Sequence, residues 1–91
     1  MATLADVLLT GSAYQDLNTS TGIIAGSPIV IQNKSSNDVR VIINPTQPAA
    51  SSENGWLLAP RASIVIENET QVVWAKATAL GNSHISVQPF V

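Results

Sequence analysis

The sequence predicts an all-β fold, a small antiparallel β-sandwich or flattened barrel of about six to eight short strands. Short runs rich in β-branched residues recur at intervals of roughly ten residues, and clusters of turn-forming residues separate them. No stretch of about twelve or more residues carries the periodicity of an amphipathic helix. With 91 residues and no internal repeat or linker, the chain is expected to form one domain over residues 1–91.

The first strands are the least distinct in the sequence. Val7 to Thr10 and Ala13 to Leu17 are strand candidates, joined by Gly11-Ser12. Residues Leu4 to Leu9 could alternatively form one helical turn. We therefore expect two short N-terminal strands and keep the helical turn as an alternative for the first.

The next two strands are predicted with a polar turn between them. Pro28 to Asn33 contains consecutive β-branched residues and ends in Asn33-Lys34-Ser35-Ser36-Asn37, whose Asn and Ser side chains bond their own backbone in turns. Asp38 to Ile43 then alternates, with Val39, Val41 and Ile43 on one face. This arrangement is typical of a hairpin, so the two strands are expected to pair antiparallel.

A long surface loop is predicted over residues 44–55. It contains two prolines, which cannot donate to a strand ladder, and the step Asn54-Gly55, which suits a positive φ. Trp56 to Leu58 follows as a short strand, and Pro60-Arg61 turns the chain. Ala62 to Ile66 is the sixth predicted strand, with Ile64 and Ile66 on one face.

The last two strands complete the predicted fold. Glu67 to Thr70 is a polar turn, and Gln71 to Lys76 is a strand. Ala77 to Ser83 is a small-residue loop around Gly81-Asn82. His84 to Phe90 is the final strand, with apolar and polar residues alternating along it.

The amino-acid composition excludes the disulfides and structural zinc sites that commonly stabilise small domains. The chain has no cysteine, so it forms no disulfide, and with one histidine it has no structural zinc site. A domain of this size buries about 60–65% of the surface that its unfolded chain exposes, which leaves little stability in reserve. Association with copies of itself or with a larger assembly is the remaining source of stability, so we expect a homo-oligomer.

Sparse charge excludes several kinds of partner. Only 11% of the residues are charged and the formal net charge is −2, which gives no field for binding nucleic acid. No apolar run approaches the roughly 20 residues that span a bilayer. The start of the chain lacks the features of a secretory signal, so we expect a protein that is made and kept in the cytoplasm. The sequons at Asn18, Asn33 and Asn68 then reduce to turn chemistry.

The sequence contains no recognisable set of catalytic residues and no cofactor-binding motif, so we expect that the protein is not an enzyme and binds no cofactor. His84 is the only histidine, and one histidine at a strand end is usually a surface group. Glu67 and Glu69 are two residues apart, which is the minimum for a carboxylate pair or a hard-cation site, but two solvated carboxylates in a polar turn are the stronger interpretation. The glycines are scattered and form no phosphate-binding loop.

Four aromatic residues are the candidates for contact with a protein partner. Tyr14, Trp56, Trp74 and Phe90 all lie in predicted strands, where each could belong to the core or to an interface. Tryptophan is strongly enriched at the centres of protein interfaces. Trp56 follows the long loop and is the first contact to test. Nearly uncharged strands such as Ile64 to Ile66 need a covered edge, which also favours assembly.

The whole chain, from Leu4 to Val87, resembles a loose group of small structural proteins encoded by tailed bacteriophages. The resemblance lies in strand and turn patterns: Asp6-Val7-Leu8-Leu9-Thr10, Tyr14-Gln15-Asp16-Leu17, Thr21-Gly22-Ile23, Ile31-Gln32-Asn33-Lys34, Thr46-Gln47-Pro48-Ala49-Ala50-Ser51-Ser52, Gly55-Trp56, Leu58-Ala59-Pro60, Val73-Trp74-Ala75-Lys76 and Ile85-Ser86-Val87-Gln88. The chain departs from this pattern at Arg61, since such proteins often place a glycine in the turn before the sixth strand. The resemblance brings no catalytic residue with it.

The resemblance implies a virion component that is present in many copies. The leading hypothesis is a capsid decoration or cement protein, made in the host bacterial cytoplasm, that binds the major capsid protein or other virion proteins and stabilises the head. A tail, collar or fibre component is the alternative within the same class. A carbohydrate-binding module for host attachment is the alternative from another class, with Trp56 or Trp74 stacking on sugar rings.

Overall fold

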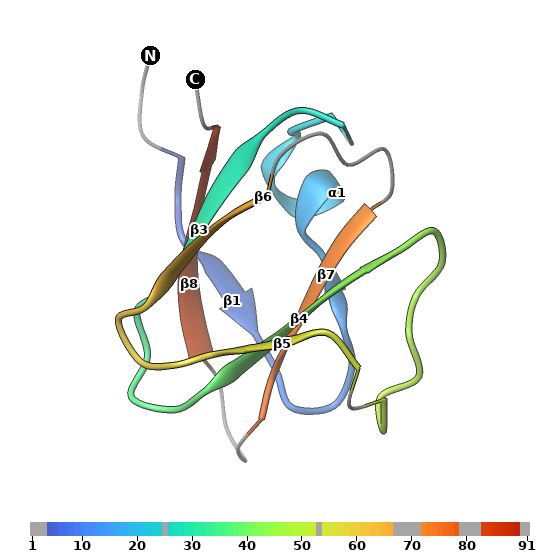
Figure 1. Cartoon of the computed structure of the whole chain (residues 1–91), viewed down its shortest axis with the longest axis vertical. Coiled ribbons are helices and arrows are strands. Elements are labelled where there is room, and N and C mark those ends of the chain that lie inside the picture. Colours follow the sequence, from blue (N-terminus) through green and yellow to red (C-terminus); the bar gives the residue numbers. More distant parts are fainter. Residues whose placement is uncertain (1–3, 25, 53, 67–71, 79–82, 90–91) are drawn as a thin grey trace.

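The fold is a sandwich of two four-stranded antiparallel sheets (Figure 1). A computed structural model describes residues 4–24, 26–52, 54–66, 72–78 and 83–89. The elements in chain order are β1 (Val7–Leu9), β2 (Gln15–Asp16), α1 (Leu17–Thr21), β3 (Ile29–Asn33), β4 (Val39–Asn44), β5 (Trp56–Leu58), β6 (Ser63–Ile66), β7 (Val72–Ala77) and β8 (Ser83–Pro89). The all-β prediction is confirmed, in its sandwich form.

Strand order identifies the topology. One sheet, sheet A, has the order β1-β8-β3-β6, and the other, sheet B, has the order β2-β7-β4-β5. The pairs β1 with β8, β2 with β7, β3 with β6 and β4 with β5 are nested, as in a long hairpin folded at β4 and β5. The pairs β3 with β8 and β4 with β7 then roll this ribbon into two sheets. This is the jelly-roll arrangement, which occurs in viral capsid, lectin and cupin domains.

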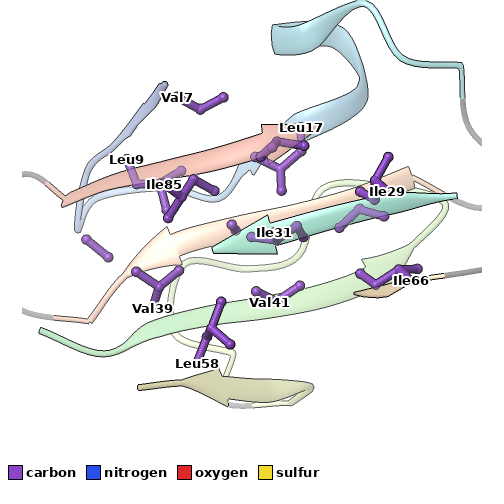
Figure 2. Close-up of a cluster of buried hydrophobic side chains, with 14 residues drawn as sticks. Val7, Leu9, Leu17, Ile29, Ile31, Val39, Val41, Leu58, Ile66 and Ile85 are labelled. Atoms are coloured by element: carbon purple, nitrogen blue, oxygen red, sulfur yellow. The ribbon is translucent and has the colours of Figure 1, made fainter. Parts of the chain in front are cut away.

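The core fills the space between the two sheets (Figure 2). Each strand turns every second side chain inward, so Ile29 and Ile31 of β3 meet Val39 and Val41 of β4 in the buried layer. Small residues alternate with them on β7, where Ala75 and Ala77 are fully covered. The alternation that predicted β4, β6 and β8 from the sequence therefore corresponds to the inner faces of these strands.

The predicted hairpin between β3 and β4 is wrong. β3 pairs with β6 and β8, whereas β4 lies in the other sheet and pairs with β5 and β7. The Asn33 side chain, which is fully buried, explains the crossing. Its Nδ2 donates to the carbonyl oxygens of Asn37 (2.7 Å) and Leu58 (2.9 Å), and its Oδ1 accepts from the N–H (2.9 Å) and hydroxyl (2.7 Å) of Ser35. The polar turn is thus a corner between the sheets.

The N-terminal region is shorter in strand and richer in helix than predicted. β1 forms as a strand against β8, so the alternative helical turn is not observed there. The second strand is reduced to Gln15–Asp16, because Asp16 caps a five-residue helix, accepting the N–H of Thr19 at 3.0 Å. Gly22 ends this helix with φ 79.

The turn between β5 and β6 has a backbone geometry that usually requires glycine at its third position, but this chain has Arg61 there. The N–H of Ala62 donates to the carbonyl of Ala59 (3.0 Å), Pro60 occupies the second position, and Arg61 at the third has φ 67. This is a type II turn, which favours glycine at that position. The departure at Arg61 therefore changes the residue and retains the turn.

Replacing Arg61 by glycine is expected to stabilise the fold slightly. The left-handed conformation costs an L-residue roughly 1–2 kcal/mol, and the greater freedom of glycine in the unfolded chain costs roughly 0.5–1 kcal/mol. The exposed Arg61→Gly variant should therefore gain up to about 1 kcal/mol, which raises Tm by a few degrees. A thermal melt measures this, and a lower Tm would show that the arginine side chain contributes more than its backbone conformation costs.

Several predictions fall on residues outside the described ranges. These are the Glu67 to Thr70 turn with its carboxylate pair, the Asn68 sequon, the Gly81-Asn82 loop centre and Phe90. The Asn33 sequon begins at the end of β3 and runs into the corner between the sheets. The Asn18 sequon lies in α1 and not in a turn; its side chain donates to the carbonyl of Ile23 and accepts the N–H of Val73. No helix in the described chain is long and apolar enough to cross a bilayer.

Candidate protein-interaction surface

The β5 edge, defined here as Trp56 and Leu57 on the last strand of sheet B, exposes the largest apolar side chains near a sheet border. Trp56 is 47% exposed and Leu57 is 54% exposed, whereas Leu58 is buried. Among the strands that the structure describes, β5 pairs with β4 alone, so its other side is a free edge with respect to them. A free edge with apolar side chains is the type of surface to which another chain adds a strand or packs a side chain.

Trp56 is exposed because of its position in the sheet and not because it points away from the core. It lies opposite Val41 in the ladder and, since side chains alternate, shares the inward side of β5 with Leu58. No other strand of the described ranges follows β5 in sheet B, and the indole is half exposed. Leu57 projects to the opposite face of the strand, beside Arg40. The β5 edge therefore presents apolar groups on both of its faces.

Fixed points on each side hold the β5 edge in place. Before it, Gly55 has φ 85 and lies against β4 so closely that an added Cβ would be 2.1 Å from the carbonyl oxygen of Val41. After it, the carbonyl of Leu58 accepts the Asn33 side chain, and Leu58 itself is in the core. A two-residue contact held between two anchors loses little conformational entropy on binding, which is a property of interface hot spots.

The adjoining edge of sheet A extends this surface. The turn from Ala59 to Ala62 carries the chain from β5 to β6, which is the last strand of sheet A. Val65 on β6 is 42% exposed on the outward face. Neither β5 nor β6 contains a charged residue; in the sequence, Arg61 lies in the turn between them and Glu67 directly follows β6. Two uncharged edges therefore meet on one side of the sandwich.

The other aromatic candidates have less surface to offer. Tyr14 is 2% exposed, and its hydroxyl donates to the carbonyl of Ser52 at 2.7 Å under the long loop. Trp74 is partly buried on the outer face of sheet B, where its Nε1 donates to the carbonyl of Asn44 at 2.9 Å. Phe90 is outside the described residues. Of the four, Trp56 has the most exposed ring among those described, and sequence reasoning missed its neighbour Leu57.

Side chains suited to catalysis or metal binding do not converge in the described chain. His84 is exposed on β8, where it lies opposite Leu8 of β1. The described residues contain no group of three or more His, Asp or Glu side chains that could hold a metal ion. A surface pocket of about 450 Å³ opens at the other side of the sandwich, lined by residues 4–8 with Gln15, Ser20 and Thr21. Its only ionisable lining group among them, Asp6, is paired with Lys34 at 2.8 Å.

Fold and surface together define the chain as a small jelly-roll sandwich with an exposed apolar edge. Comparison with protein-family models, with curated proteins and with solved structures found no match to this chain.

Proposed function

We propose that this protein is a structural subunit of a bacteriophage virion, which binds copies of itself and neighbouring virion proteins through the β5 edge. The half-exposed Trp56 on a free, uncharged strand edge is the observation that carries this proposal. The resemblance to small structural proteins of tailed phages gives the virion context. The jelly-roll topology is compatible with it, since many capsid proteins use this fold, although fold alone does not determine function.

A decoration subunit on the capsid is the form of this function that we favour. Its mechanism is mass action: a protein that binds only the assembled lattice stabilises it by RT ln(1 + [L]/Kd), about 2.7 kcal/mol per site at a hundredfold excess over Kd. Many copies of a small domain then stabilise the shell without any covalent bond. A tail, collar or fibre position uses the same edge contacts with a different neighbour.

Self-association through Trp56 is the first prediction. Trp56→Ala should weaken association by about 30-fold or more, because the centre of an interface loses a hot-spot side chain worth about 2 kcal/mol. Sedimentation equilibrium over a range of protein concentrations measures the change. Tm in the dissociated state should stay within a few degrees of the parent, since nearly half of the indole is already exposed.

A matched control lies on the opposite edge of sheet A. Leu8 on β1 is 46% exposed, close to the value for Trp56, and Leu8→Ala removes an apolar side chain from the other side of the sandwich. It should leave association unchanged. A parent protein that is monomeric at all concentrations, or an oligomer that Leu8→Ala disrupts and Trp56→Ala does not, would contradict the proposed interface.

The position of the protein in the virion distinguishes a decoration subunit on the head from a tail, collar or fibre component. Electron microscopy of purified virions that carry the labelled protein should show labels dispersed over the head, and labels confined to the tail would reject the decoration role. The exposed Trp56 ring also allows the alternative of sugar binding, because an indole face can stack on a sugar ring. Trp56-dependent binding on a glycan array would favour that alternative.

A further inference from the structure

The step Asn54-Gly55 joins the long loop to the β5 edge. Asn54 is exposed, and it is the only asparagine in the sequence that precedes a glycine. In such a step the main-chain nitrogen of the glycine can attack the amide carbon of the asparagine side chain. Glycine hinders this attack least, because it has no Cβ. The chemistry of this step therefore bears directly on the β5 edge.

Hydrogen bonding leaves the reacting groups of this step available. In the described part of the chain, neither the Asn54 side chain nor the N–H of Gly55 makes a hydrogen bond. The Asn54 main chain makes two long bonds, both at 3.5 Å: its N–H donates to the Ser52 Oγ, and its carbonyl accepts from the Arg40 Nη1. Hydrogen bonds of this length are weak. The Gly55 nitrogen can therefore turn toward the Asn54 side chain.

The other asparagines in the described ranges are protected from the same attack. The N–H that follows Asn18 donates to a carboxylate at 3.0 Å, and the N–H that follows Asn33 donates to a main-chain carbonyl at 3.0 Å. Asn44 precedes a proline, which has no N–H. The carbonyl of Asn37 accepts two short bonds, at 2.7 and 2.9 Å, which fix the peptide group that contains the next nitrogen. Asn54 is thus distinguished by its contacts as well as by its neighbour.

We propose that Asn54 is a site of spontaneous modification, at which the side-chain amide is converted to aspartate and isoaspartate. In the first step the Gly55 nitrogen bonds to the Asn54 Cγ and the Cγ–Nδ2 bond breaks, so ammonia leaves with the proton of the Gly55 N–H. The attack is intramolecular and needs no partner. Water then opens the cyclic imide, adding OH to one ring carbonyl carbon and a proton to the Gly55 nitrogen. Opening at Cγ gives aspartate, and opening at the main-chain carbonyl gives isoaspartate.

Isoaspartate should displace the β5 edge, because it lengthens the main chain by one carbon directly before Gly55. Gly55 packs so closely on β4 that an added Cβ would be 2.1 Å from the Val41 carbonyl oxygen. Trp56 follows directly and pairs with Val41 in the ladder. A shift at Gly55 therefore moves the exposed indole. The effect on association rests on the proposed function of the β5 edge, whereas the modification itself does not.

Peptide mass spectrometry of the full chain, incubated at neutral pH and sampled over time, tests the site. The protein is kept dilute so that association does not cover the loop, and tryptic peptides 35–40 and 41–61 separate Asn37 from Asn54. Conversion at Asn54 should be at least about tenfold faster than at Asn37, because no side chain crowds the attack and no short hydrogen bond opposes it. The rate should rise with pH, since the attacking nitrogen must lose its proton. Asn54→Gln keeps an amide but needs a larger ring, so position 54 of this control should stay unconverted.

The same measurement in urea separates the effect of the fold from that of the sequence. Unfolding should accelerate conversion at Asn37 and change the rate at Asn54 by less than about threefold, because an exposed loop opens at little cost in free energy. A folded chain in which Asn54 converts no faster than Asn37 would overturn the proposed site.

Sedimentation equilibrium of the purified isoaspartate form tests the consequence for the β5 edge. Its association should be weaker than that of the parent by about tenfold or more, because Trp56 is displaced. Unchanged association of this form would reject the displacement of the edge. A parent that is monomeric and still converts at Asn54 would reject the proposed interface and support the modification site, so the two proposals can fail separately.

Discussion

The Asn33→Asp variant is expected to lose about 4 kcal/mol of folding stability, although the two side chains have nearly the same shape. In the parent, the Asn33 amide donates to two main-chain carbonyls and is fully buried. A carboxylate cannot donate to them, so two hydrogen bonds are lost at about 1–3 kcal/mol each, although the Ser35 hydroxyl stays 2.9 Å from the Asn37 carbonyl, and a charge is buried as well. A domain of this length has a total stability of about 5–14 kcal/mol. Urea denaturation at neutral pH measures the loss.

Acid should partly rescue this variant. Burial raises the pKa of the introduced carboxyl above its usual range, so the folded state binds its proton more tightly than the unfolded state does. The lost stability should therefore return as the pH is lowered toward the pKa in the unfolded chain. The control is Asn44→Ala, which removes a surface amide that donates to the carbonyl of Thr46 and should cost less than about 1 kcal/mol. A similar loss in both variants at neutral pH would contradict the role given to Asn33.

Gly55→Ala is expected to cost about 3 kcal/mol or more. The residue has φ 85, which costs an L-residue roughly 1–2 kcal/mol. In addition, an added Cβ would be 2.1 Å from the Val41 carbonyl oxygen and 2.8 Å from the Ile42 Cγ1. Main-chain atoms of β4 cannot move away without disturbing the ladder between β4 and β5. Chemical denaturation gives the loss, and amide exchange on β5 should become faster than in the parent.

A second glycine in the same chain separates the two contributions. Gly22 has φ 79, but an added Cβ there would meet nothing within 4 Å. Gly22→Ala should therefore cost only the conformational part, up to about 1 kcal/mol once the greater freedom of glycine in the unfolded chain is subtracted. The difference between the two variants measures the close approach at Gly55, and equal losses would show that steric crowding against β4 has no effect.

Both predictions concern the β5 edge, the surface through which we propose that the protein associates. The Asn33 side chain donates to the carbonyl of Leu58, and Gly55 allows the chain before β5 to pack closely against β4. The two residues therefore fix the two ends of the β5 edge. A variant that loosens either end should weaken association as well as folding. This consequence separates them from Trp56→Ala, in which association is expected to weaken while the fold remains stable.

Much of the fold could be read from the sequence because strand patterns are local. Alternation in 38–43, 62–66 and 84–90 predicted the inner faces of β4, β6 and β8, and the Asn54-Gly55 step predicted a positive φ that Gly55 does adopt. The short helix was missed because five residues show no periodicity, although Asp16 and Gly22 are ordinary cap residues for it. Trp56 could be selected from residue type and position alone.

The sequence by itself determined the all-β class, most strand positions and the turn chemistry, because each depends on neighbours along the chain. Which strands pair depends on the tertiary structure: the hydrogen bonds of the buried Asn33 side chain hold the predicted hairpin turn as a corner between the sheets. It alone brought Arg40 beside Lys76, 36 positions later in the chain, through the register of β4 with β7. It also separated the buried Tyr14 from the half-exposed Trp56, since burial depends on the loop or strand that lies across a residue in space.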